Sequence, residues 1–142
     1  MKLDTVKLVI DLKSLSRGIN RGVFTIPLEK IEWNIEGVEP FDRQGTLDLM
    51  VDLEDEAVLC SGRLDANFRT PCARCLKPTR FSIIEEIYRE YAWSPDPASE
   101  EQREVISKSG ELDIFDAVQE AVLLSIPGKP LCYPDCAGIC YN

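Results

Sequence analysis

The stretch LDLMVDLEDEAVLCSGRLDANFR, residues 47–69, decides the fold. Apolar side chains take every second position from residue 47 to residue 53. The acidic run at residues 54–56 interrupts this pattern, which resumes with apolar or small residues at every second position from 58 to 68. A period of two is typical of strands with one buried face. The stretch therefore predicts a β-hairpin that turns at residues 54–56.

The same periodicity appears on the N-terminal side of this hairpin. It predicts a first strand over residues 6–12 and a short β-prone run at residues 23–26, and it recurs at residues 31–35. Residues 37–45 contain Pro40 and are expected to form a loop.

Beyond the hairpin, residues 81–93 fit a strand better than a helix. Their β-forming side chains share one parity, namely Phe81, Ile83, Ile87, Tyr91 and Trp93. Glu85 and Arg89 interrupt that pattern, and the glutamates of this stretch would also suit a helix. Residues 94–110 hold two prolines and no apolar period, so we expect a mobile loop there.

A helix is predicted after this loop. Asp113 is placed to cap it, with Asp116 at the third helical position, and Pro127 with Gly128 ends it. Its apolar stripe consists of Phe115, Val118, Ala121, Val122 and Ile126. A helix docked on the sheet through this stripe would bring the C-terminal residues 130–142 close to the end of the long hairpin.

The composition indicates one soluble globular domain of 142 residues, with 44% hydrophobic and 29% charged residues. A chain of this length buries roughly two-thirds of its unfolded surface, so a core without disulfides is expected. The sequence shows no apolar run near eighteen residues and no signal-peptide pattern, which predicts a cytosolic or organellar protein. The net charge of −9 argues against a generic nucleic-acid binder.

Five of the six cysteines form two tight clusters. Cys72 and Cys75 are a C-x2-C pair, and the C-terminal residues hold a C-x3-C-x3-C series, Cys132, Cys136 and Cys140. Thiols stay reduced in the cytosol, which makes a disulfide framework improbable. Prolines and a glycine shape both clusters into turns, and turns of this kind hold tetrahedral zinc. We therefore expect a structural zinc site built from these five residues.

Cys60 differs from the other thiols because it lies on the apolar face of a predicted strand. There it is expected to behave as a small core residue. A redox role for the Cys72–Cys75 pair stays open, since Arg74 between the two thiols would lower their pKa values. The sequence context lacks the βαβ pattern of thioredoxin-like proteins, which disfavours that role.

Basic residues gather around the C-x2-C pair, in contrast to the acidic remainder. Between residues 63 and 80 a single acidic residue, Asp65, stands against Arg63, Arg69, Arg74, Lys77 and Arg80. Basic side chains beside a metal-held turn could contact RNA phosphates. The alternative is that these side chains are solvated and bind nothing, which is the better expectation for any one of them.

These elements predict an α+β fold, in which a curled antiparallel sheet of about five strands is covered by one C-terminal helix and closed by a cysteine knuckle. Residues 72–76, the opening of the helix at residues 112–113, its end at residues 124–127 and the Cys132–Cys140 spacing together resemble the YceD family. The resemblance covers residues 45–142, and it makes the chain a single YceD-like domain.

The resemblance implies a non-enzymatic factor in ribosome biogenesis that supports accumulation of large-subunit ribosomal RNA in bacteria or plastids. Its partner would be the ribosomal RNA precursor, or a basic ribosomal protein or assembly factor. In many members of that family the tail continues to a further Cys-Gly pair, whereas this sequence ends at Asn142. The comparison therefore favours Cys72, Cys75, Cys132 and Cys136 as zinc ligands, with Cys140 as a substitute.

Two other classes compete with this interpretation. A small zinc-stapled interaction domain without RNA contact fits the same residues. A zinc or thiol enzyme fits poorly, because the chain has no histidine and shows no nucleotide-binding or hydrolase motif. The expected location is the bacterial cytoplasm or the plastid stroma, and no membrane partner is expected.

Overall fold

A computed structural model of the chain describes residues 1–93, 104–106, 109–128 and 130. It contains two sheets, one α-helix and two short 3-10 helices. A six-stranded sheet has the order β3-β5-β6-β7-β8, with β4 paired to β6, and a smaller sheet has the order β1-β2-β9. The strands are β1 Leu3–Asp4, β2 Val9–Asp11, β3 Gly18–Pro27, β4 Glu39–Pro40, β5 Gln44–Leu53, β6 Ala57–Pro71, β7 Pro78–Ala92, β8 Glu104–Val105 and β9 Glu111–Asp113. The helices are α1 Phe115–Ser125, η1 Leu12–Ser14 and η2 Leu28–Lys30.

Three long antiparallel strands, β5, β6 and β7, form the centre of the molecule. β5 and β6 make the hairpin predicted from residues 47–69, with Leu47 opposite Leu64 and Leu53 opposite Val58. β7 then pairs with β6 along its whole length, which confirms the strand expected at residues 81–93. The alternation of the sequence is realised as one buried and one exposed face of each strand.

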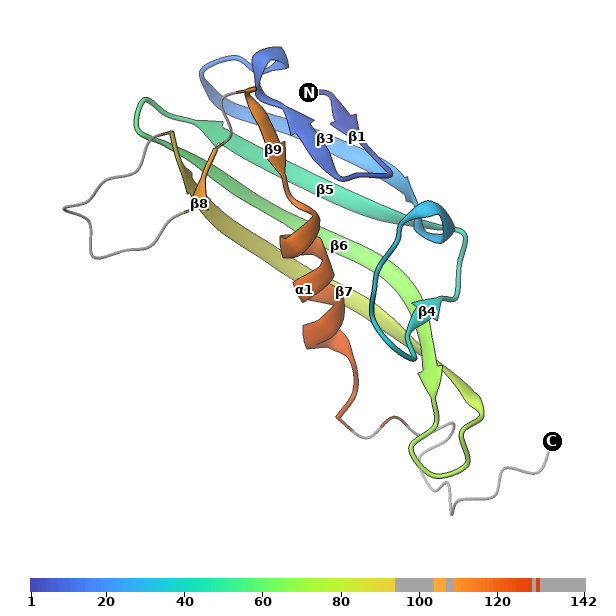
Figure 1. The fold of residues 1–142 in the computed structure, drawn as a ribbon. Coiled ribbons are helices and arrows are strands. Elements are labelled where there is room, and N and C mark those ends of the chain that lie inside the picture. Colours follow the sequence, from blue (N-terminus) through green and yellow to red (C-terminus); the bar gives the residue numbers. More distant parts are fainter. Residues whose placement is uncertain (94–103, 107–108, 129, 131–142) are drawn as a thin grey trace.

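The core lies between one face of the large sheet and a layer formed by α1 and the small sheet. Figure 1 shows β9 leading directly into α1, which crosses the sheet in front of β6 and β7. The predicted apolar stripe is confirmed, because Val118, Ala121 and Val122 are buried and Phe115 and Ile126 pack, partly buried, against the core. Its N-cap is Ile114, one residue after the predicted cap, although the Asp113 carboxylate accepts the N–H of Phe115 at 2.9 Å.

The α+β class and the C-terminal helix are confirmed, but two features of the predicted sheet are wrong. The sheet is mixed, since β8 joins β7 in parallel with Tyr91 opposite Glu104. It is neither curled nor closed, because β3 and β8 lie at opposite margins. Short β8 arises within residues 94–110, where we expected a mobile loop; the flanking residues 94–103 and 107–108 lie outside the described part.

The predicted first strand over residues 6–12 is confirmed only at Val9–Asp11, which form β2, because a turn occupies residues 5–8. The carboxylate of Asp4 accepts the N–H groups of Val6 and Lys7, each at 3.0 Å, and so turns the chain at the position where the strand was expected. These two bonds, Lys7 first, lower the pKa of Asp4. Leu8 adopts φ 57° and is fully buried, so the apolar pattern reflects core contacts across a turn between β1 and β2.

The alternation at residues 31–35 likewise forms no strand. Trp33 is buried in a loop, where its ring meets Phe68 edge-on at 5.2 Å. The indole N–H donates to the Leu28 carbonyl at 2.9 Å, and Gln119 of α1 donates to the Trp33 carbonyl at 2.7 Å. This loop therefore ties the helix to the sheet.

Candidate functional site

The turn between β6 and β7 carries the C-x2-C pair. Its ends are fixed by the last strand pair, Pro71 opposite Pro78. Within the turn the N–H of Cys72 donates to the carbonyl of Lys77 at 2.8 Å, and the N–H of Leu76 donates to the carbonyl of Cys72 at 3.0 Å. The Cys72 side chain is fully buried, and Cys75 is half-buried. Two thiol-bearing residues thus occupy one tight turn at the end of the sheet.

Leu76 gives this turn an unusual backbone. Its φ is 64°, in the left-handed region that costs a branched residue about 1–2 kcal/mol. Its side chain is 75% exposed, so burial of the side chain does not offset that cost. Strain of this kind persists where the surrounding structure fixes the backbone.

The residues that follow α1 return to this turn. The carbonyl of Pro130 accepts the N–H of Ala73, between the two cysteines, at 2.6 Å. Figure 1 shows the end of α1 directed toward the same end of the β6–β7 hairpin. Cys132 follows Pro130 by two residues in the sequence. Sequence reasoning anticipated that the helix would bring the two clusters together, but it did not identify this backbone bond.

The thiols are the residues that could hold a metal. No group of three or more His, Cys, Asp or Glu side chains comes together within the part of the chain that the structure describes. Cys132, Cys136 and Cys140 lie outside that part. The donors present at the turn, two thiols at C-x2-C spacing, are the soft ligands that zinc prefers. Cys72 and Cys75 would supply two of the four ligands of a zinc ion, and thiols are the donor type that zinc takes in structural sites.

Cys60 is confirmed as a core residue. It is 1% exposed, and burial raises its thiol pKa from 9.0 to about 11. Twelve residues of extended chain separate it from Cys72, a span of roughly 40 Å. Cys60 is therefore protonated at neutral pH and remote from the turn.

Four of the five predicted basic residues gather at the turn. Arg74 and Lys77 are exposed within it, and Arg69 lies opposite Arg80 on the adjoining strands. Arg69 donates to the Glu39 carboxylate at 2.8 Å. Figure 1 shows β4, which carries Glu39, beside this end of β6.

Two further observations concern Arg80 and Arg63 of the predicted basic residues. The guanidinium of Arg80 lies 5.2 Å from the centre of the Phe41 ring, a cation–π contact. Arg63 lies six residues from Arg69 along β6, or about 20 Å away. It sits between Asp48 and Glu86 on the neighbouring strands. The structure therefore separates Arg63 from the other four basic residues. Only its proximity in the sequence had placed it in their group.

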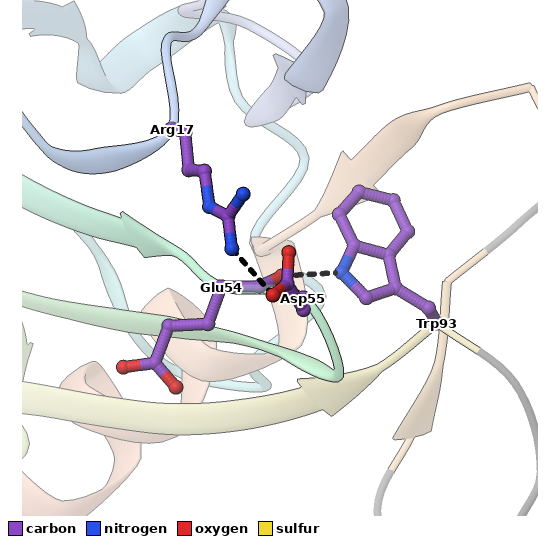
Figure 2. Close-up of polar contacts among 4 residues, drawn as sticks. All are labelled: Arg17, Glu54, Asp55 and Trp93. Atoms are coloured by element: carbon purple, nitrogen blue, oxygen red, sulfur yellow. Dashed lines mark hydrogen bonds and ion pairs between the residues drawn. The ribbon is translucent and has the colours of Figure 1, made fainter.

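The opposite end of the large sheet is acidic. Residues 54–56 form the β5–β6 turn, and all three are exposed. Figure 2 shows Arg17 paired with Asp55 and the indole of Trp93 directed at the Glu54 backbone. Trp93 donates to the Glu54 carbonyl at 2.9 Å. The sequence did not predict the contacts of Arg17 and Trp93, because the periodicity of apolar residues carries no information about such long-range polar contacts.

The open face of the sheet carries a shallow depression of about 600 Å³. It is lined by both charge signs and by apolar groups, including Arg21, Asp48, Met50, Arg63, Glu86 and Tyr88. Acid and base alternate across the strands here, as Asp48, Arg63 and Glu86 stand side by side. Such a surface lacks the single charge sign that phosphate binding requires.

Comparison with known proteins identifies the family of this chain. A family model described as large ribosomal RNA subunit accumulation protein YceD matches residues 60–142, which include the turn and all five clustered cysteines. The chain belongs to the YceD family. No solved structure matches it significantly.

Its curated relatives are mycobacterial proteins of uncharacterized function. Uncharacterized protein Rv2926c of Mycobacterium tuberculosis is 35% identical over 100 residues, which cover 66% of this chain and 47% of the relative. Protein ML1660 of Mycobacterium leprae is 28% identical over 97 residues, covering 66% of this chain and 45% of the relative. The chain thus spans about half the length of the curated relatives it matches. No helix among the described residues is long and apolar enough to cross a membrane.

Proposed function

We propose that this YceD-family protein is a non-catalytic factor that supports accumulation or processing of large-subunit ribosomal RNA. The family description names that RNA. The structural observation that carries the proposal is the bond from Ala73 to Pro130, which joins the C-terminal residues to a turn bearing two cysteines and exposed basic side chains. We place the functional surface at this turn, in the cytoplasm of a bacterium or the stroma of a plastid.

We further propose that a structural zinc ion staples the C-terminal residues to the turn. Cys72 and Cys75 would supply two thiolates, and Cys132 and Cys136 the other two, with Cys140 as a substitute. The reach of the chain supports this, since two residues beyond Pro130 span at most about 7 Å. When bound, the ion would supply cross-linking energy rather than chemistry, because an all-thiolate site is closed.

The proposed RNA contact rests on the cations at this end. Arg74 and Lys77 extend from the turn, while Arg69 and Arg80 flank it with part of their charge engaged by Glu39 and Phe41. Contacts of this type would be made to phosphates, carry little sequence information and weaken with salt. Arg63 is placed too far along β6 to share one short RNA segment with the turn.

Binding to fragments of large-subunit ribosomal RNA at low salt tests this contact. We expect the double charge reversal Arg74→Glu with Lys77→Glu to weaken binding at least about tenfold and to reduce the salt dependence by roughly two phosphate contacts. Arg17→Glu with Lys13→Glu, an equal charge change at exposed sites outside the turn, is the matched control and should bind like the wild type. Equal affinity of all three proteins would exclude the turn as the RNA-binding surface.

A cellular measurement tests the function itself. Depletion of the protein from its host should lower large-subunit ribosomal RNA relative to small-subunit RNA, and the wild-type chain should restore the ratio. An unchanged ratio after depletion would refute the proposed function. Failure of the charge-reversed protein alone to restore it would connect the function to the turn.

A second candidate is an interaction domain that docks on a basic ribosomal protein or assembly factor without touching RNA. The net charge of −9 favours it, since charge complementarity steers such partners together. The acidic turn at residues 54–56 would then be the contact surface. Asp55→Lys should fail to restore the RNA ratio in the cellular assay, whereas the protein with both Arg74→Glu and Lys77→Glu should restore it.

A further inference from the structure

Among the described residues, the outer margin of β7 is a strand edge. β6 pairs with β7 along one side, whereas β8 joins the other side only at Tyr91 and Ala92. Within the described part of the chain, residues 79–87 therefore have a strand partner on one side only. Figure 1 shows β7 as the border strand of the sheet over this length. The main-chain groups of such an edge can pair with a further strand.

A groove runs between this edge and α1. Its volume is about 210 Å³, and its strand wall is formed by the consecutive residues 86–89. Successive strand residues point to opposite faces, so a wall made of four in a row is formed in part by their main chain. The groove therefore exposes the backbone edge of β7 and not only side chains.

The helix wall has room for an added strand. Four residues at positions i, i+3, i+4 and i+7 line it: Ala117, Glu120, Ala121 and Leu124. The short side chains of the two alanines leave space beside the helix, and Leu124 at the rim of the groove is 69% exposed. On the other face of the edge, Ile84 is 60% exposed. An extended segment placed here would find apolar contacts on both of its faces.

The charges beside the groove select its occupant. Glu86 and Glu120 line it and Glu85 flanks it. Arg89 pairs with Glu120 and Arg63 lies opposite Glu86 on β6, so the carboxylates outnumber the cations. A second copy of the chain would bring another net charge of −9 to this edge. A lysine- or arginine-rich segment is attracted to the same place.

We propose that the β7 edge and the α1 groove bind an extended, basic polypeptide segment of a partner protein, which adds to the sheet as a further strand. Main-chain hydrogen bonds to residues 79–87 give the affinity, and pockets for alternate side chains give the preference for small apolar residues. The edge shares β7 with Arg80 of the proposed RNA contact, but its groove lies at residues 86–89, and the proposal does not depend on RNA binding.

The test uses the full chain and three synthetic twelve-residue peptides, with binding followed by fluorescence anisotropy. The first peptide alternates lysine with valine, and the second replaces lysine by glutamate. The third is the lysine peptide methylated at every backbone nitrogen of its six central residues. We expect binding of the first, and at least about tenfold weaker binding of the other two. Absence of binding by the lysine peptide, or equal binding of the methylated form, would overturn the proposal.

Hydrogen exchange locates the bound peptide. Alternate amides of residues 79–87 should exchange more slowly when the lysine peptide is present. Glu86→Lys should weaken binding several-fold, while Glu29→Lys, an equal charge change at an exposed site on η2, should not. Protection elsewhere, or equal effects of the two variants, would place the peptide at another surface. Dimerisation of the protein alone with these amides protected would make a second copy the occupant and refute the proposal.

Discussion

The two ends of β6 are built in different ways. At the β5–β6 end a short acidic turn is closed by contacts among described residues: the N–H of Glu54 donates to the Ala57 carbonyl at 3.0 Å, and Trp93 and Arg17 add the bonds of Figure 2. At the β6–β7 end the turn contains a left-handed leucine, two cysteines and a backbone bond to Pro130. The first end is satisfied by its neighbours. The second has strain at Leu76 and a main-chain bond to Pro130, and it is the end at which we propose the zinc cross-link.

The largest expected effect compares two buried thiols on this one hairpin. Cys72 and Cys60 are 0% and 1% exposed, so a buried hydroxyl should cost about 1–3 kcal/mol of unfolding free energy at either position. Cys72→Ser should exceed Cys60→Ser by more than about 4 kcal/mol, because it also removes a metal ligand. Urea unfolding of both variants measures the difference. Equal losses would mean that Cys72 is a core residue like Cys60.

The pH dependence of stability tests whether Cys60 is a buried, protonated thiol. Burial raises the pKa of Cys60 from 9.0 to about 11, so the unfolded chain releases this proton first as the pH rises. The unfolding free energy should therefore fall between pH 9 and 11, by roughly 3 kcal/mol from this group. Unfolding curves of the wild type and of Cys60→Ala at pH 8 and pH 11 isolate the contribution. An identical loss in both proteins would contradict the assignment.

Leu76 tests whether the β6–β7 turn stores strain. Leu76→Gly relieves the left-handed backbone at φ 64° and removes a side chain that is 75% exposed. We expect a gain of about 1 kcal/mol in unfolding free energy. Leu8→Gly is the contrasting variant, since Leu8 has φ 57° but is fully buried, and it should be destabilised. A destabilised Leu76→Gly protein would show that the exposed side chain contributes to folding.

The smallest effects are expected at the acidic end. Trp93→Phe removes the hydrogen bond to the Glu54 carbonyl and should cost about 0.5–1.5 kcal/mol. Arg17→Ala should cost about 0.5 kcal/mol or less, because the side chains of its ion pair are 75% and 74% exposed. Thermal unfolding of both variants provides the measurement. A larger loss for Arg17→Ala than for Trp93→Phe would mean that charge, and not the indole contact, closes this end.

Much of the fold was predictable because periodicity reports burial. The β5–β6 hairpin, strand β7 and the apolar stripe of α1 follow from the spacing of apolar residues, and Cys60 follows from the parity of its strand. The same signal failed at residues 6–8 and at Trp33, where apolar residues reach the core from a turn and a loop. The Asp4 hydrogen bonds that bend the first segment depend on local geometry, which a period does not encode.

The candidate site was predictable in part. Cysteine spacing located the turn, and the helix was expected to lead toward it. The bond between Ala73 and Pro130 joins main-chain atoms of residues far apart in the sequence, so no side-chain pattern could predict it. Arg63 was grouped with the turn by sequence proximity, but an extended strand separates residues by about 3.3 Å each and carries it away. The parallel addition of β8 is another long-range pairing without a local signal.

The central claim is that the two cysteine clusters share a zinc ion at the β6–β7 end. Its most direct test is the metal content, by mass spectrometry, of the freshly purified wild type and of Cys60→Ser, Cys72→Ser and Cys132→Ser. We expect about one zinc ion per chain in the wild type and in Cys60→Ser, and its loss from both other variants. A metal-free wild type, or zinc retained by both Cys72→Ser and Cys132→Ser, would contradict the account.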